Sequence, residues 1–385
     1  MHRKIIALIT VMVMLLCGCS KRNGPKLQVQ GHMNGMWVSY IEMDAMLNSD
    51  FERSFEKLLL DVKERKITDL FVHVRPFCDA YYKSELFPLR EGAKTYNFDI
   101  LHYMVDMCHK NGIRLHAWIN PYRVRTADSN IAALPTDSIA RIWLEDETTE
   151  NDTNVSFSSG IYLNPASTGV QEFLIRSIRE LLNNYEVDGI HFDDYFYPTK
   201  SEDFDAALYE QYRQGTNNPL EVSSWRRENV SATISSINDA IKFINNQVIF
   251  SISPAASIDK NYNEFYADIA LWCEMGMLDL VIPQLYFGFE YAQSEYKFNN
   301  ILDTWLKLER AENVKLIVGL GAYKMLESGI NDAAEWQNPN LLLRQVRLCY
   351  NTKAVDGVSF YSYTSLFSDN EISKTSLEYL KNAYN

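Results

Sequence analysis

The sequence alternates short apolar segments with segments of helical periodicity, and this alternation limits the fold more than any other feature. The apolar segments lie at residues 35–40, 69–75, 113–120, 187–192, 248–253, 280–286, 315–319 and 357–363. Between them lie segments such as 51–66, in which Phe51, Phe55 and Leu58 recur at the spacing of one helix face. Eight strand–helix units with right-handed crossovers predict an α/β fold, a single (β/α)8 TIM barrel.

Two of the expected connections are long. Residues 122–165, after the third strand, are rich in Asp, Thr, Ser and Asn, and residues 195–224 follow the fourth strand. Connections of this length in a compact domain are usually lids or binding loops. We therefore expect the long loops after strands 3 and 4 to border a site.

The N-terminus has the features of an export signal. Arg3 and Lys4 precede an apolar run at residues 5–16, which is shorter than the roughly 20 residues of a membrane span. The segment Leu16-Cys17-Gly18-Cys19 resembles a bacterial lipobox, although a plain secreted form is the alternative. We predict a signal peptide at 1–18, a lipidated N-terminus and tether at 19–33 with Cys19 as the lipidated residue, and the barrel domain at 34–385. Such a protein would be lipid-anchored in the cell envelope, and if the organism is Gram-negative it would lie on the outer membrane or the periplasmic face.

The charge of the chain limits its partners. Removal of residues 1–18, with Arg3 and Lys4, changes the formal net charge from −13 to −15. This charge argues against nucleic acid or anionic lipid as the main partner, so membrane attachment would depend on the N-terminal lipid alone. Cys78, Cys108, Cys273 and Cys349 are far apart and form no CxxC pair, which favours buried thiols over disulfides. We expect a monomer.

The fourth strand ends in an unusual group of side chains. Residues 187–198 read as a buried strand followed by Asp193, Asp194, Tyr195, a further aromatic pair and Pro198. Barrels of this kind carry their chemistry at the carboxyl ends of the strands. One of these aspartates could cap the loop and the other could be solvated, but a carboxylate pair among aromatic rings favours a functional role.

Other strand ends add polar and aromatic groups to the same rim. Because side chains alternate along a strand, His73 should share a face with Arg75, His116 with Trp118, and His191 with Asp193. The candidate catalytic residues are Asp193, Asp194, Asp79 and Glu42, and the candidate substrate-binding residues are Arg75, His116, Trp118, Asn120, His191, Tyr195, Gln284, Tyr286 and Tyr361.

This mixture suits a polysaccharide, because polar groups bind hydroxyls and rings cover the apolar faces of sugars. Glycosidic cleavage needs a proton donor and a nucleophile or base, which carboxylates supply when their environments separate their pKa values. This chemistry requires no cofactor.

The motifs also resemble a known group. The sequence is similar to the glycosyl-hydrolase-like family 10 of bacterial exported proteins, which have TIM barrels. The resemblance rests on residues 74–80, 117–123, 188–198, 225–227, 252–254 and 283–286. It departs at Cys78, where Gly is frequent, and at Asn164, where Asp is frequent. The resemblance implies a glycoside hydrolase acting on bacterial glycans, including peptidoglycan strands stripped of their peptides.

The fourth-strand segment also resembles a degraded form of the chitinase-type family 18 pattern. Asp188, Gly189 and Asp193 match it, whereas His191 and Tyr195 replace an Asp and the catalytic Glu. The resemblance leaves open a mechanism in which the N-acetyl group of the substrate assists, oriented by one of the two aspartates.

Two other functions remain open. His73, His116 and His191 lie on neighbouring strands and could bind zinc with an Asp, although no HxH or HxxEH spacing supports this. Alternatively, the rim could be the cleft of a non-catalytic glycan-binding lipoprotein, which would not need to retain so many carboxylates.

Overall fold

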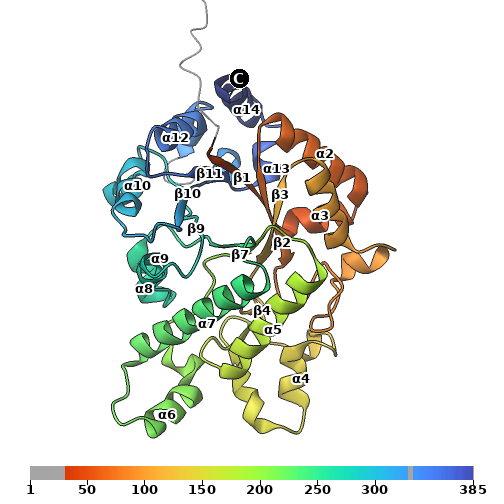
Figure 1. Cartoon of the computed structure of the whole chain (residues 1–385), viewed down its shortest axis with the longest axis vertical. Helices are drawn as coiled ribbons and strands as arrows, with labels where there is room; N and C mark the ends of the chain where they lie inside the picture. The colour runs from red at the N-terminus through yellow and green to blue at the C-terminus, as the bar shows by residue number, and fades with distance from the viewer. Residues whose placement is uncertain (1–30, 328–332, 385) are drawn as a thin grey trace, which may run out of the picture.

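The centre of the molecule is a closed barrel of parallel strands. The computed structural model describes residues 31–327 and 333–384. The barrel order is β1-β11-β10-β9-β8-β7-β3-β2. Its strands are β1 (Met33–Val38), β2 (Asp69–Arg75), β3 (Arg114–Ile119), β7 (Gly189–Phe192), β8 (Ile249–Ile252), β9 (Leu280–Val281), β10 (Lys315–Leu320) and β11 (Gly357–Phe360). The predicted (β/α)8 barrel is confirmed (Figure 1).

Helices follow every barrel strand and form the outer layer. They are α1 (Tyr40–Leu47), α2 (Phe51–Glu64), α3 (Ile100–Lys110), α4 (Ile139–Glu145), α5 (Thr168–Asn184), α6 (Ala206–Gly215), α7 (Val222–Ile244), α8 (Ile258–Glu264), α9 (Ile269–Glu274), α10 (Phe298–Leu306), α11 (Ala333–Trp336), α12 (Leu341–Tyr350), α13 (Tyr363–Leu366) and α14 (Glu371–Tyr384). Side-chain caps begin several of them. Asp50 accepts from the backbone N–H of Arg53 at the start of α2, and Asp99 accepts from that of His102 at the start of α3.

The sixth barrel strand is shorter than the sequence suggested. A strand was expected over 280–286, but β9 ends at Val281. Pro283 lacks an N–H and cannot continue the ladder. The chain still follows its neighbours through single hydrogen bonds, from Gln284 N to Pro254 O at 3.0 Å and from Gly319 N to Pro283 O at 2.9 Å. This irregular path brings the Gln284 side chain to the mouth of the barrel.

The core has two parts, one inside the barrel and one between the barrel and the helices. The inner part consists of Met33, Trp37, Phe71, Trp118, Leu280, Ile282 and Ile317. Alternate residues on the same strands, such as Leu70 and Val72, pack outward against the helices. Gly189 is required by this packing, because a Cβ there would lie 2.2 Å from Nδ1 of His116.

Aspartates at the starts of alternate strands fasten the N-terminal end of the barrel. Oδ2 of Asp188 accepts from Leu115 N at 2.8 Å, and Oδ2 of Asp356 accepts from Leu316 N at 2.9 Å. Asp279 makes the same contact with the backbone of β8. In each case the carboxylate binds the first free N–H of the preceding strand, which fixes the register of the two neighbours.

The long loop after β3 contains its own small sheet. This sheet is antiparallel, with the order β4-β6-β5, and consists of β4 (Arg123–Arg125), β5 (Val155–Phe157) and β6 (Ile161–Leu163). The long loop after β7 contains α6. Figure 1 shows α4 and α6 at one end of the molecule, away from α12 and α14, with α5 and α7 running toward them.

The predicted signal peptide and Cys19 lie outside the described residues. Within residues 31–327 and 333–384, no helix is long and apolar enough to cross a membrane. The four remaining cysteines, Cys78, Cys108, Cys273 and Cys349, are free and buried, as expected.

Candidate active site

Asp193 lies at the C-terminal end of β7 and is held by three donors. The indole Nε1 of Trp118 donates to its Oδ2 at 3.1 Å, and Nδ2 of Asn120 donates to its Oδ1 at 3.0 Å. The backbone N–H of Tyr195 donates to Oδ1 at 3.2 Å. The residue is only 2% exposed. These bonds fix the carboxylate in one orientation beneath the mouth of the barrel.

The surroundings of Asp193 act on its charge in opposite directions. Burial raises its pKa, whereas the Arg123 guanidinium and the hydrogen bonds from Tyr195, Trp118 and Asn120 lower it. Burial has the largest effect, so the pKa of Asp193 lies above its usual value. Hydrogen bonds to a carboxylate stabilise its ionised form, and these donors therefore oppose its protonation.

Asp194, the next residue, is partly exposed and has a different environment. Nε2 of Gln284 donates to its Oδ1 at 3.1 Å, and the same Nε2 donates to the carbonyl of Ser253 at 3.0 Å. Burial, together with the neighbouring Asp193 charge, raises the pKa of Asp194 to about 7. A carboxylic acid with this pKa is protonated in part at neutral pH, as a general acid must be.

Aromatic rings form a wall beside the aspartate pair, which we define as Asp193 and Asp194. Tyr361 stacks with Tyr286, with ring centroids 5.8 Å apart and planes 18° apart. The Tyr361 ring also contacts Trp118 edge-on at 6.4 Å, and Tyr323 contacts both tyrosines at 5.7 Å. Stacked rings next to acid groups provide a surface for the apolar face of a sugar.

Tyr195 lies on the solvent side of the site, with 55% of its surface exposed. The guanidinium carbon of Arg123 lies over this ring, 4.0 Å from the centroid. The structure therefore brings together Asp193, Asp194, Trp118, Asn120, Tyr195, Gln284, Tyr286 and Tyr361 from the predicted site residues.

The two histidines among the predicted site residues, His116 and His191, lie deeper in the barrel. Nε2 of His116 contacts Oδ1 of Asp69 at 2.8 Å, near the N-terminal end of the barrel. His191 accepts a 3.0 Å hydrogen bond from the Trp37 indole and pairs through Nδ1 with Ser251 at 2.8 Å. Burial lowers the pKa of His191 well below its usual value. His116 thus belongs to the barrel interior, and His191 supports the floor of the mouth.

The three histidines that could have bound zinc have other partners in the structure. His73 stacks on Trp118 with centroids 3.3 Å apart, while His116 and His191 bind the partners given above. In the described part of the chain, no three His, Cys, Asp or Glu side chains converge as metal ligands do. The histidines pack against rings and bind protein groups instead.

Arg75 lies away from the mouth, contrary to the alternation that was expected. The pairing of β2 with β3 shifts register between His73 and Arg75, so the two side chains do not share a face. The Arg75 guanidinium instead lies 4.4 Å from the Phe87 ring centroid and is buried. Burial lowers its pKa. A β-bulge cannot be read from apolar alternation, which explains the error.

Glu42 is occupied by hydrogen bonds that fasten α1. Its Oε2 accepts from Ser39 N at 2.5 Å, in the capping box at the start of that helix. Its Oε1 accepts from Ser362 Oγ at 2.8 Å and from both the N and Oγ1 of Thr364 at 2.7 Å. Both carboxylate oxygens are thus occupied, and Oε1 joins the first barrel unit to the last.

Asp79 lies in a cluster of its own beside the mouth. Nη1 of Arg90 donates to its Oδ2 at 2.9 Å, and the same guanidinium binds Asp44 through Nη2 at 2.7 Å. Burial raises the pKa of Asp79 although Arg90 opposes this. Asp79 and Arg90 line a cavity of about 290 Å³ that also includes Phe77 and Ser138. No hydrogen bond in the described chain joins Asp79 to the aspartate pair.

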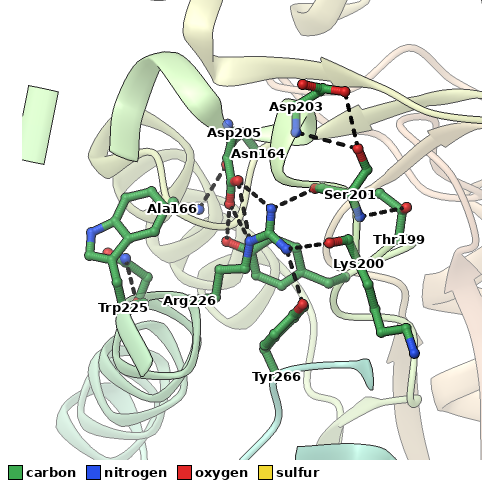
Figure 2. Close-up of polar contacts among 12 residues, drawn as sticks. Asn164, Ala166, Thr199, Lys200, Ser201, Asp203, Asp205, Trp225, Arg226 and Tyr266 are labelled. Atoms are coloured by element: carbon green, nitrogen blue, oxygen red, sulfur yellow. Dashed lines mark hydrogen bonds and ion pairs between the residues drawn. The ribbon is translucent and has the colours of Figure 1, made fainter. Parts of the chain in front are cut away.

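The loop that follows the aspartate pair is anchored by a buried ion pair, shown in Figure 2. Nη2 of Arg226, on α7, donates to Oδ1 of Asp205 at 2.5 Å and to the carbonyl of Ser201 at 2.7 Å. Nη1 donates to the carbonyl of Lys200 and to the hydroxyl of Tyr266. Nε also binds Asp205, so every nitrogen of the guanidinium has a partner. This network fixes residues 200–205 and therefore the direction in which the chain leaves the aspartate pair.

Three contributors to the site were not predicted as such. Trp37 supports His191 from β1, Arg123 contacts Tyr195, and Arg226 anchors the loop. Trp37 lies at an inward-facing position of its strand, and the alternation of side chains along that strand could have predicted this. Arg123 and Arg226 both occur within motifs of the sequence, but only the folded chain brings them to the loop after β7.

Comparison with known proteins shows the family of the chain. The profile described as "Glycosyl hydrolase-like 10" matches residues 32–338. Glycosyl hydrolase YngK of Bacillus subtilis is 30% identical over 338 residues, which are 82% of this chain and 64% of YngK. This chain thus spans less than two thirds of YngK. Glycosyl hydrolase DigH of Escherichia coli K12 is 27% identical over 379 residues, covering 83% of each protein.

A solved structure shows the same fold. The glycoside hydrolase domain of PgaB from Bordetella bronchiseptica superposes with a TM-score of 0.64 and 12% identity, covering 91% of this chain and 99% of the domain. The family profile covers most of the barrel, including both members of the aspartate pair. The protein therefore belongs to the Glycosyl hydrolase-like 10 family.

Proposed function

We propose that this protein cleaves glycosidic bonds of a cell-envelope polysaccharide, and that peptidoglycan glycan strands are its substrate. The observation that carries the proposal is the difference between two adjacent carboxyl groups. Asp194 is partly exposed with a pKa of about 7, whereas Asp193 is buried and accepts hydrogen bonds from three residues. Such a difference suits one group to donate a proton and the other to remain ionised.

Asp194 is the proton donor in this proposal. Its protonated carboxyl group gives a proton to the leaving oxygen as the bond from that oxygen to the anomeric carbon breaks. Gln284 holds Oδ1 of Asp194 by a 3.1 Å hydrogen bond, which leaves the other oxygen to face the substrate. Asp193 supplies a fixed negative charge that stabilises the positive charge developing on the sugar.

The nucleophile is best supplied by the substrate. Asp193 is buried and both of its carboxylate oxygens accept hydrogen bonds, from Trp118, Asn120 and Tyr195, so it is held in place and not free to attack the sugar. Glu42 and Asp79, which could have served as the nucleophile, are held by Ser362 and Arg90. A 2-acetamido oxygen can attack the anomeric carbon as the leaving group departs, and water then opens the cyclic intermediate. Peptidoglycan strands carry such acetamido groups throughout.

The experiment is a digestion of purified strands by the full-length protein. Glycan strands with stem peptides, strands without them and strands with the acetamido groups removed would be incubated separately, and new reducing ends would be followed by mass spectrometry. The proposal expects cleavage of acetylated strands and none of deacetylated strands. Cleavage of deacetylated strands would overturn the assisted mechanism.

Matched variants define the outcome further. Asp193→Asn and Asp194→Asn should abolish cleavage, while Asp79→Asn should retain it. Strands that bind to the protein on an affinity gel but are never cleaved would favour the glycan-binding alternative. Strands that neither bind nor react would mean that the substrate is wrong.

A further inference from the structure

A positive charge lies at the mouth of the barrel, and the described part of the chain gives it no carboxylate partner. Arg123, at the start of β4, is half-buried between two rings, with its guanidinium carbon 4.0 Å from the Tyr195 centroid and 5.7 Å from that of Phe77. Within residues 31–327 and 333–384, no carboxylate lies within ion-pair distance of it. The neighbouring Arg125 differs, because its Nη2 lies 2.7 Å from Oδ2 of Asp128.

The charge of Arg123 acts on the site. Burial lowers the pKa of His73 and the Arg123 charge lowers it further, while the same charge opposes the rise that burial causes in the pKa of Asp193. It therefore lies close to both groups. His73 is itself neutral, and its Nε2 is buried without a hydrogen-bond partner. His73 thus has a ring nitrogen that no group in the described part of the chain satisfies.

Arg123 does not hold the aspartate pair in place. The Asp193 oxygens accept their hydrogen bonds from Trp118, Asn120 and the backbone of Tyr195, and none comes from the guanidinium of Arg123. A guanidinium has five N–H donors arranged to bind a carboxylate in pairs. The Tyr195 ring and a hydrogen bond with the Tyr195 side chain hold the guanidinium in place, and most of its five donors remain for a ligand.

The overall charge of the protein makes this cation significant. With a formal net charge of −13, the surface as a whole repels an anionic polymer. An anionic substrate therefore needs a local positive charge at the point where it enters the site. Arg123 supplies such a charge beside Asp193.

We propose that Arg123 binds a carboxylate carried by a sugar next to the bond that is cleaved. This inference rests on the proposed function, because it names a chemical property of the same substrate. The carboxylate could be a lactyl ether acid on an amino sugar or the C6 acid of a uronic sugar, and both present the same group to a guanidinium. Conversion of that carboxylate to an amide removes its charge and with it the pairing with Arg123.

The test compares four oligosaccharides on the full-length protein. They are a neutral N-acetylglucosamine oligomer, a strand with free lactyl carboxylates, the same strand with those carboxylates converted to methyl amides, and a strand that alternates glucuronate with N-acetylglucosamine. Both kcat/KM and, with the Asp194→Asn variant, the dissociation constant would be measured. Arg123→Gln is the test variant, and Arg125→Gln is the matched control on the same strand.

The expected result is a preference for one of the two carboxylate strands over its uncharged counterparts. Arg123→Gln should reduce kcat/KM for that strand about tenfold to a hundredfold, the range for loss of a hydrogen bond to a charged group. It should change the values for the amide and neutral strands little, and Arg125→Gln should change none of them. The lactyl and glucuronate arms identify which acid is recognised.

Two results would overturn the inference while leaving the proposed function intact. One is equal cleavage of the carboxylate and amide strands by the wild-type protein. The other is an equal loss on all strands in Arg123→Gln, which would mean that the residue acts only through Asp193. If no strand is cleaved but carboxylate strands bind Asp194→Asn through Arg123, the inference stands and the proposed function fails. Absence of both cleavage and binding would contradict both.

Discussion

The indole of Trp118 donates a 3.1 Å hydrogen bond to Asp193, and this bond connects the aromatic wall of the site to one carboxylate of the aspartate pair. The same indole stacks on His73 and contacts the edge of Tyr361. One side chain therefore fixes a carboxylate and also forms part of the surface on which a sugar would rest. Orientation of the carboxylate and position of the substrate are thus coupled through Trp118.

The rate should depend on the protonation of Asp194. Its pKa is raised to about 7, so the carboxyl group is protonated below this pH and ionised above it. A general acid works only when protonated, and kcat should therefore fall by tenfold for each pH unit above the pKa. A pH profile between 5 and 9 on unsubstituted glycan strands would measure this. A rate that stays constant from pH 6 to 9 would contradict the assignment.

The same group should make the folded state less stable at high pH. The unfolded pKa of an aspartate is about 3.9, and the folded pKa of Asp194 is higher, about 7. The folded state therefore binds the proton more tightly, and stability falls as pH rises from the unfolded value through the folded one. We expect the Tm of the wild type to fall between pH 5 and 8 more steeply than that of Asp194→Asn.

Asn at position 194 can still accept the hydrogen bond from Gln284, so the variant is a fair comparison. An equally steep decline in both proteins would show that other groups cause the pH dependence. Asp303→Asn, a change in α10 outside the site, serves as a control for the general loss of one negative charge.

Glu42→Gln should reduce stability more than activity. Oε1 and Oε2 of Glu42 accept hydrogen bonds from Ser39, Ser362 and Thr364, and an amide nitrogen cannot accept any of them. Loss of hydrogen bonds to a charged group should lower the free energy of unfolding by about 1.5–3 kcal/mol. Urea denaturation would measure this, with the exposed Glu52→Gln on α2 as the control.

At 25 °C the folded Glu42→Gln protein should keep kcat within about threefold of the wild type, equivalent to about 0.7 kcal/mol in the barrier. A variant of unchanged stability that has lost its activity would instead return Glu42 to the catalytic group.

Arg226→Ala should disrupt the loop after β7. The substitution leaves the Asp205 carboxylate buried without its partner, since Tyr197 alone would still donate to it. Removal of one member of a buried ion pair costs about 3–5 kcal/mol of stability. Urea denaturation would again measure the loss, and Arg213→Ala, which removes an exposed pair with Glu210, should change stability by less than about 1 kcal/mol. Equal effects of the two substitutions would contradict the anchoring role.

The sequence was sufficient to predict the barrel because each unit combines two periodicities in a fixed order. Strand ends such as those of β3 and β7 also placed Trp118, Asn120 and Asp193 correctly at one rim, since parallel strands end at the same face. The environment that distinguishes Asp194 from Asp193 was not predictable. It depends on Gln284, which lies 90 residues away and reaches the site through an irregular segment.

The differences between the expected and the observed placement of these residues have separate physical causes. A β-bulge turned Arg75 out of the mouth, and the length of β3 left His116 one inward-facing position too deep, next to Asp69. Glu42 follows the first strand, and this position predicted a catalytic place at the rim. It is also the third residue of α1, where a carboxylate suits a capping box. The pairing of β2 with β3 and the contact between His116 and Asp69 depend on distant parts of the chain, whereas the capping box of Glu42 is local.

The central claim is that Asp194 protonates the leaving group, and a comparison of two substrates tests it most directly. A natural glycan strand needs this proton, whereas a 4-nitrophenyl glycoside of the same acetamido sugar releases a weakly basic phenolate that does not. The rate of Asp194→Asn would be measured on both, beside the wild type and Asp79→Asn. The account predicts a loss of about 10²–10⁴-fold on the strand, a much smaller loss on the nitrophenyl glycoside, and little loss on either in Asp79→Asn. Equal losses on both substrates in Asp194→Asn, or a strand rate that Asp79→Asn reduces as much, would contradict it.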